Sequence, residues 1–169
     1  MKSIFTNVLM VSFLLVGCGR QVTSGGGAPS TPPPTDPVKA KFTLVLFGAP
    51  WCTNCKSEFP KINEGLKGEL TKPSALIQGS LLVTSNATPS EKPTQEAADT
   101  YRNFLKMDFS AAPDEWRCKK YKQWVKLTSC AIPAGVLLDD KENVVLTFEP
   151  GATTFNSERV ISEVKAKLQ

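Results

Sequence analysis

The sequence contains no histidine. Catalytic arrangements in which an imidazole activates a serine or cysteine nucleophile are therefore excluded. A phosphate-binding loop is also missing, because Gly25-Gly26-Gly27 lies among polar and proline residues and not between a strand and a helix. These absences leave triad-peptidase and nucleotide-binding functions without support.

Neither sign of charge is in strong excess: 20 lysines and arginines stand against 16 acidic residues, a net charge of +4. The basic residues are scattered along the chain, and Lys119, Lys120, Lys122 and Lys126 are accounted for by a solvated helix face. We therefore expect no nucleic-acid partner.

The apolar stretch at the start of the chain, residues 4–16, is shorter than the roughly 20 residues that cross a bilayer. Lys2 precedes it, so residues 1–17 are predicted to be a signal peptide. The run Leu15-Val16-Gly17-Cys18 resembles the bacterial lipobox. The resemblance implies cleavage before Cys18, a lipid on its sulfur and acylation of the new amino terminus. An ordinary secretory signal with an incidental cysteine is the alternative.

Residues 18–39 are predicted to be the lipidated cysteine followed by a tether. Ser24-Gly25-Gly26-Gly27 predicts flexibility, and Pro32-Pro33-Pro34 predicts extended polyproline geometry. In a cell with two membranes, Gly19 favours anchoring at the outer one with the domain facing the periplasm, because an aspartate at this position commonly retains lipoproteins on the inner membrane. The remaining residues, 40–169, suffice for one domain with its own core.

Helix and strand patterns alternate along this domain. Strands are predicted at residues 41–47, 76–84, 136–139 and 144–149, and helices at 54–70, 94–106, 115–126 and 157–168. Pro60 predicts a kink in the first helix, and residues 140–143 predict a hairpin between the last two strands. The order predicts an α/β domain with a mixed sheet flanked by helices on both faces.

Two cysteines separated by two residues follow the first predicted strand, in the run Trp51-Cys52-Thr53-Asn54-Cys55-Lys56. The strand ends in Gly48-Ala49-Pro50, so both thiols fall at the start of a helix. There the unpaired N–H groups and the helix dipole favour a thiolate. The spacing also lets the two sulfurs close a disulfide, so the pair can exchange two electrons with another dithiol.

Two runs resemble motifs of the TlpA/ResA-type periplasmic thiol-disulfide oxidoreductases of the thioredoxin-like superfamily. Residues 51–60 match Trp-Cys-x-x-Cys-[Arg/Lys]-x-Glu-x-Pro, and residues 132–139 are similar to the family's cis-proline loop and the strand after it. The resemblance covers about residues 40–169. It implies a thioredoxin fold, disulfide exchange with exported proteins bearing thiols or disulfides, a membrane electron donor or acceptor protein, and no dissociable cofactor.

The resemblance also implies roles for single residues. Cys52 would attack the substrate, Cys55 would resolve the mixed disulfide, and Trp51 would pack beside the pair. Pro133, if its peptide bond is cis, would stand opposite the sulfurs and present the backbone of Ile132 to an extended substrate strand.

One departure from thioredoxin concerns the proton of the resolving cysteine. Leu46 stands where thioredoxin has a buried acid, so Glu58 or water would accept that proton. A surface carboxylate is the alternative account of Glu58. Lys56 either favours the thiolate weakly or is only solvated. The uncharged pair Thr53-Asn54 predicts an intermediate reduction potential.

Cys118 and Cys130 are additional to the motif, and their interpretation stays open. They form a structural disulfide, or a second redox pair that relays electrons, or two buried free thiols. In an exported protein the structural disulfide is favoured, because such surroundings let disulfides persist.

The sequence thus predicts a lipid-anchored thiol-disulfide oxidoreductase that works as a reductase. A disulfide oxidant or isomerase is the alternative within the same class. Two other classes remain: a metal-binding protein with Cys52, Cys55, Cys118 and Cys130 as thiolate ligands, and a non-catalytic thioredoxin-like adaptor. We expect no metal, because the gap between the two cysteine pairs is unlike that of compact zinc sites.

Overall fold

The computed structural model describes residues 40–70, 76–115, 118–151 and 154–169. The predicted signal peptide, Cys18 and the tether lie outside these ranges. So does Trp116, which falls within the helix predicted at 115–126. None of the described helices is both long enough and apolar enough to cross a membrane.

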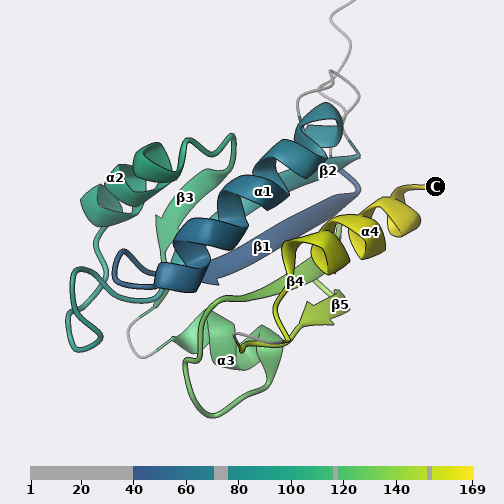
Figure 1. Ribbon diagram of the computed structural model, residues 1–169. Helices are drawn as coiled ribbons and strands as arrows, with labels where there is room; N and C mark the ends of the chain where they lie inside the picture. The colour runs from purple at the N-terminus through teal and green to yellow at the C-terminus, as the bar shows by residue number, and fades with distance from the viewer. Residues whose placement is uncertain (1–39, 71–75, 116–117, 152–153) are drawn as a thin grey trace, which may run out of the picture. The chain divides into compact units, whose positions relative to one another are not determined.

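A mixed five-stranded sheet lies at the centre of the domain (Figure 1). The strands follow one another across it as β3 (Ser110–Pro113), β2 (Ile77–Val83), β1 (Phe42–Gly48), β4 (Ala134–Asp139) and β5 (Val144–Phe148). The first three are parallel to one another, and β4 and β5 run antiparallel to their neighbours. The middle strand, β1, is buried from Leu44 to its end, as expected for an apolar strand covered on both faces.

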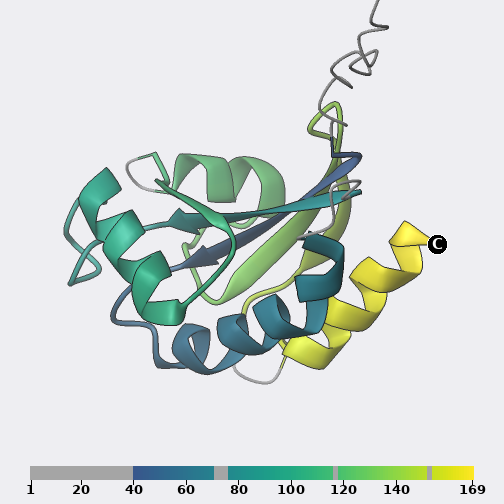
Figure 2. The same cartoon turned by 90° about the horizontal axis from the view of Figure 1, so that it is seen from above.

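Helices cover both faces of this sheet (Figure 2). One face packs against α1 (Thr53–Leu70), α2 (Gln95–Leu105) and α4 (Ser157–Leu168), and the other packs against α3 (Lys119–Val125). Successive side chains of β1 alternate between the two cores: Leu44 and Leu46 point into the first, Val45 and Phe47 into the second. The predicted fold class is confirmed.

Patterns in the sequence did not predict β3. Its four residues, Ser110–Pro113, include two alanines and a proline, which have low strand propensity. The strand forms because its backbone pairs with the edge of β2 from Ser80 to Val83. Phe109 anchors the approach, since its ring packs where a side chain at Gly79 would collide with it.

The third helix is shorter than the predicted 115–126. Cys118 adopts a left-handed backbone conformation, φ 59°, which an α-helix cannot contain, so α3 starts at Lys119. The buried carboxylate of Asp114 satisfies the N–H groups of Lys120 and Tyr121, at 3.0 and 3.3 Å, near this start. In contrast, α1 remains helical through Pro60 over its 18 residues.

Gly48 ends β1 against the first turns of α1, where there is no room for a side chain. A Cβ there would lie 2.6 Å from Phe59 Cε2 and 3.5 Å from Cys55 Sγ. We expect Gly48→Ala to lower the free energy of unfolding in urea by about 1–3 kcal/mol, because Phe59 must move. Gly68→Ala, also in α1 but with nothing within 4 Å of the added carbon, should raise it by about 0.5–1 kcal/mol. Equal effects of the two substitutions would contradict this packing.

Candidate active site

Cys52 occupies the N-cap of α1, directly before its first residue. The N–H of Cys55 donates a hydrogen bond to Cys52 Sγ at 3.1 Å, and the N–H of Lys56 donates to the Cys52 carbonyl at 3.3 Å. The sulfur thus takes the place of the serine or aspartate oxygen in an ordinary N-cap. The same N–H, together with the helix dipole, would stabilise a thiolate at Cys52 once the protein is reduced.

A disulfide joins Cys52 to Cys55, with an S–S distance of 2.07 Å and a Cα–Cα distance of 5.3 Å. Cys52 retains 5% of its accessible surface, whereas Cys55 retains none. Of the two cysteines, only Cys52 is therefore open to an incoming thiol or disulfide. This difference fits the predicted order of attack.

Trp51 directly precedes Cys52, and its indole is held by a hydrogen bond to a residue that follows β2. Its indole Nε1–H donates to Ser85 Oγ at 2.8 Å, and Ser85 is buried just after β2. Trp51 keeps 39% of its surface exposed, so it can contact a substrate. No signal in the sequence pointed to Ser85, since a serine in a polar loop is unremarkable before the fold is known.

The segment before β4 lies at the same edge of the sheet as the dithiol. The peptide bond between Ile132 and Pro133 is cis. Because β4 runs antiparallel to β1, with Ala134 opposite Phe47, the start of β4 meets the end of β1. Ile132 packs against the apolar cluster that contains Cys52 and Cys55. The two motifs read from the sequence are therefore neighbours in space.

Solved structures share this fold. A secreted Mycobacterium tuberculosis disulfide oxidoreductase, described as homologous to E. coli DsbE, matches with a TM-score of 0.51 and 15% identity over 76% of this chain and 84% of that one. The chain has a thioredoxin fold.

Two further thioredoxin-fold comparisons agree. A thioredoxin-related protein from Neisseria meningitidis serogroup B matches with a TM-score of 0.52 and 17% identity, over 76% of this chain and 85% of that one. The reduced N-terminal domain of PilB from N. meningitidis matches with a TM-score of 0.50 and 17% identity, over 78% and 83%. No protein-family model and no curated protein matches the chain.

A second disulfide in this thioredoxin fold joins Cys118 to Cys130, with a Cα–Cα distance of 6.1 Å. The Tyr121 hydroxyl donates to the carbonyl of Ala131 at 2.6 Å, next to the cis-proline loop. Cys118 and Tyr121 belong to the apolar cluster under α3, and Cys130 packs against it, on the opposite face of the sheet from the cluster that holds Cys52. The second disulfide thus ties α3 to the loop without facing the first.

This separation bears on two of the alternatives. The four cysteines do not converge, so they cannot supply one four-thiolate metal site in this arrangement. In the described ranges no three histidine, cysteine or acidic side chains gather as a metal site would need. Direct relay of electrons would require a sulfur of one disulfide to touch a sulfur of the other, and the sheet lies between them.

Glu58 is directed at α4 rather than at the dithiol. Its carboxylate accepts the Ser157 N–H at 3.0 Å and pairs with the Lys61 ammonium at 2.9 Å. Partial burial raises the pKa of Glu58, but the hydrogen bonds from Lys61 and Ser157 outweigh it and lower the pKa to about 2. A carboxylate that is already engaged by Ser157 and Lys61 favours the alternative account of Glu58 as a surface carboxylate. Leu46, fully buried, offers no alternative base.

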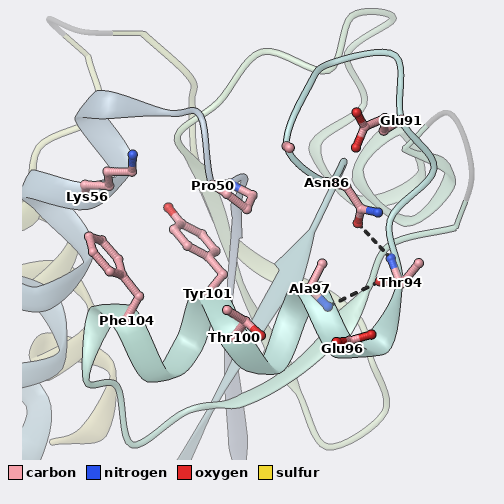
Figure 3. Close-up of a pocket in the computed structure, with 11 residues that line it drawn as sticks. Pro50, Lys56, Asn86, Glu91, Thr94, Glu96, Ala97, Thr100, Tyr101 and Phe104 are labelled. Carbon is pink, nitrogen blue, oxygen red and sulfur yellow. Dashed lines mark hydrogen bonds between the residues drawn. The ribbon is translucent and has the colours of Figure 1, made fainter.

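A cavity of about 530 Å³ opens beside the dithiol helix, between α1, the segment after β2, and α2 (Figure 3). Pro50, Lys56, Tyr101 and Phe104 line one part of it. The Lys56 ammonium lies 5.8 Å from the centre of the Phe104 ring, so it is directed toward α2. The sequence did not reveal this cavity, because Tyr101 and Phe104 fit the helical pattern of core residues equally well.

The Glu58 contacts predict a pH effect on stability. Because the folded-state pKa lies below the ordinary 4.5, Glu58 stabilises the protein fully above pH 4.5 and loses this effect as the pH falls toward 2. The free energy of unfolding in urea should therefore fall more steeply between these pH values in the wild type than in Glu58→Gln. Glu64→Gln, on the exposed side of the same helix, should keep the wild-type slope. Parallel curves for Glu58→Gln and the wild type would refute the assignment.

Proposed function

We propose that the protein is a thiol-disulfide oxidoreductase that exchanges disulfides with exported proteins through Cys52 and Cys55. The contact that carries the proposal is the hydrogen bond from the Cys55 N–H to the Cys52 sulfur, at 3.1 Å. It places a thiolate-stabilising donor on the sulfur of Cys52, the cysteine of the pair that keeps some exposed surface, next to a cis-proline loop. The M. tuberculosis protein with the same fold is itself described as a disulfide oxidoreductase.

In the reducing direction the exchange proceeds in two displacements. The Cys52 thiolate attacks a substrate disulfide, which forms a mixed disulfide and releases one substrate thiolate. The Cys55 thiol then loses its proton and attacks the Cys52 sulfur, which closes the Cys52–Cys55 disulfide and releases the second thiolate. Two electrons pass to the substrate. Water accepts the Cys55 proton, because Leu46 has no group that could accept it and the Glu58 carboxylate is held by Ser157 and Lys61.

Work as a reductase is favoured over work as an oxidant. A strong oxidant needs an unusually stabilised thiolate, and the absence of histidine removes the Cys–His pairing that supplies one. The two residues between the cysteines are uncharged. A membrane protein that donates electrons would then return the dithiol to its reduced state.

The reduction potential tests the direction. Titration against defined dithiol buffers should give a value near that of thioredoxin, about −270 mV, and a value near about −120 mV would indicate an oxidant. Thiol counting at the midpoint should show that Cys52–Cys55 opens while Cys118–Cys130 stays closed. Cys52→Ser should abolish insulin reduction, whereas Cys55→Ser should accumulate a mixed disulfide. Insulin reduction that survives in Cys52→Ser would refute the catalytic proposal and favour another role for the fold.

The matched control removes the second disulfide. A protein carrying Cys118→Ala and Cys130→Ala should keep the midpoint of the first couple and lose about 3 kcal/mol of stability, as closing a loop of about a dozen residues predicts. If its midpoint moves with the removal, the second pair takes part in electron transfer.

We further propose that Cys18 anchors the protein to a bacterial membrane by its lipid, with the outer membrane favoured. The support is the run Leu15-Val16-Gly17-Cys18 followed by a proline-rich and glycine-rich segment. Cell fractionation should find the wild type with membranes and Cys18→Ala in the soluble exported fraction. A wild-type protein that is soluble after export would show an ordinary secretory signal instead.

A further inference from the structure

The cavity beside the dithiol helix has features that the exchange reaction alone does not require. Pro50, two residues before Cys52, forms part of its wall, and Tyr101 and Phe104 project from α2 into the same part (Figure 3). Phe104 keeps 65% of its surface exposed, although Tyr101 and Leu105 on the same helix are buried. A large aromatic side chain at the rim of a cavity is suited to cover an apolar group from another molecule.

Tyr101 adds an unpaired polar group to this wall. Its side chain is 3% exposed, and its buried hydroxyl has no hydrogen-bond partner. Burial raises the pKa of this hydroxyl, so it keeps its proton and remains a donor. A buried polar group without a partner is costly, and a ligand that brings an acceptor would remove that cost.

Charge is distributed unevenly along the cavity. Lys56 lies at the end near Phe104, and Glu91 and Glu96 lie toward the other end (Figure 3). Within the described part of the chain neither of these carboxylates forms an ion pair. A cation is therefore attracted to the glutamate end and repelled from the Lys56 end, which fixes the direction of a charged ligand.

We propose that this cavity binds the substrate polypeptide next to its reacting cysteine, taking a large apolar side chain between Pro50, Tyr101 and Phe104 and a lysine or arginine at Glu91 and Glu96. The proposal rests on the proposed function, because the substrate is the protein whose disulfide Cys52 attacks. The exchange mechanism does not determine which polypeptides are preferred, and the cavity would supply this preference. The Tyr101 hydroxyl donates to an acceptor on the bound segment.

Synthetic peptides test this preference directly. Each peptide has one cysteine joined in a mixed disulfide to thionitrobenzoate, with leucine and lysine moved through the three positions on either side. The reduced Cys52 thiolate attacks the peptide sulfur and displaces coloured thionitrobenzoate, and Cys55 then releases the peptide as a thiol. The two electrons come from the protein dithiol, and the Cys55 proton goes to the buffer. Hydroxyethyl disulfide, which cannot fill the cavity, reports the dithiol chemistry alone.

In at least one register, the second-order rate constant of the reduced wild type should be about tenfold higher with leucine than with alanine at the apolar position. Lysine should be favoured over glutamate about threefold at low ionic strength, with the preference lost at high salt. Phe104→Ala should erase the leucine preference, and Glu91→Gln combined with Glu96→Gln should erase the lysine preference. Tyr101→Phe should slow every peptide. Leu76→Ala is the control. It removes an exposed apolar side chain just before β2, whereas the cavity is lined by the segment after β2, so it should leave all peptide rates unchanged.

Hydroxyethyl disulfide distinguishes failure of the cavity proposal from failure of the proposed function. If the wild type reduces it but treats all peptides alike, the cavity is not a substrate site and the proposed function stands. If the wild type reduces neither, the proposed function fails and this proposal with it. If Phe104→Ala slows hydroxyethyl disulfide as much as the peptides, Phe104 acts on the dithiol and the recognition proposal is overturned.

Discussion

The hydrogen bond from the Cys55 N–H to the Cys52 sulfur is the contact on which the site depends. It forms because α1 begins at Thr53, which makes Cys52 the N-cap and leaves the Cys55 N–H without a helical partner. The start of α1 is in turn fixed by Phe59, which packs against the bare backbone of Gly48. A backbone donor at a helix end is part of the fold itself, so this source of thiolate stabilisation requires no ionisable neighbour.

The sheet then gathers the other parts of the site around this sulfur. On one side, β2 runs parallel to β1 and delivers Ser85, which orients Trp51. On the other side, β4 runs antiparallel and starts at the cis-proline loop. Residues more than 80 positions apart in the chain meet because both flanking strands pair with β1. The site is therefore a property of strand order as much as of the Cys-x-x-Cys motif.

Local patterns were enough to predict the dithiol, the helix that carries it and most of the elements around them, and the family resemblance pointed to the proline loop. Each of these depends on spacing within a few residues, as in the apolar stripe Phe59, Ile62 and Leu66 of α1. Contacts between distant segments escaped prediction. The backbone pairing that makes β3, and the partner of Trp51, left no local trace. Glu58 was one candidate partner of Cys55 because it follows closely in the sequence, whereas its carboxylate faces the start of α4.

The cis-proline loop is fastened from the face of the sheet that does not carry the dithiol. The Cys118–Cys130 bond and the Tyr121–Ala131 hydrogen bond both reach it from α3. Sequence changes on that remote helix can therefore reshape how the loop presents its backbone, while the electronic environment of Cys52, set by α1, stays constant. The choice of partner and the reduction potential can thus change independently during the evolution of such proteins.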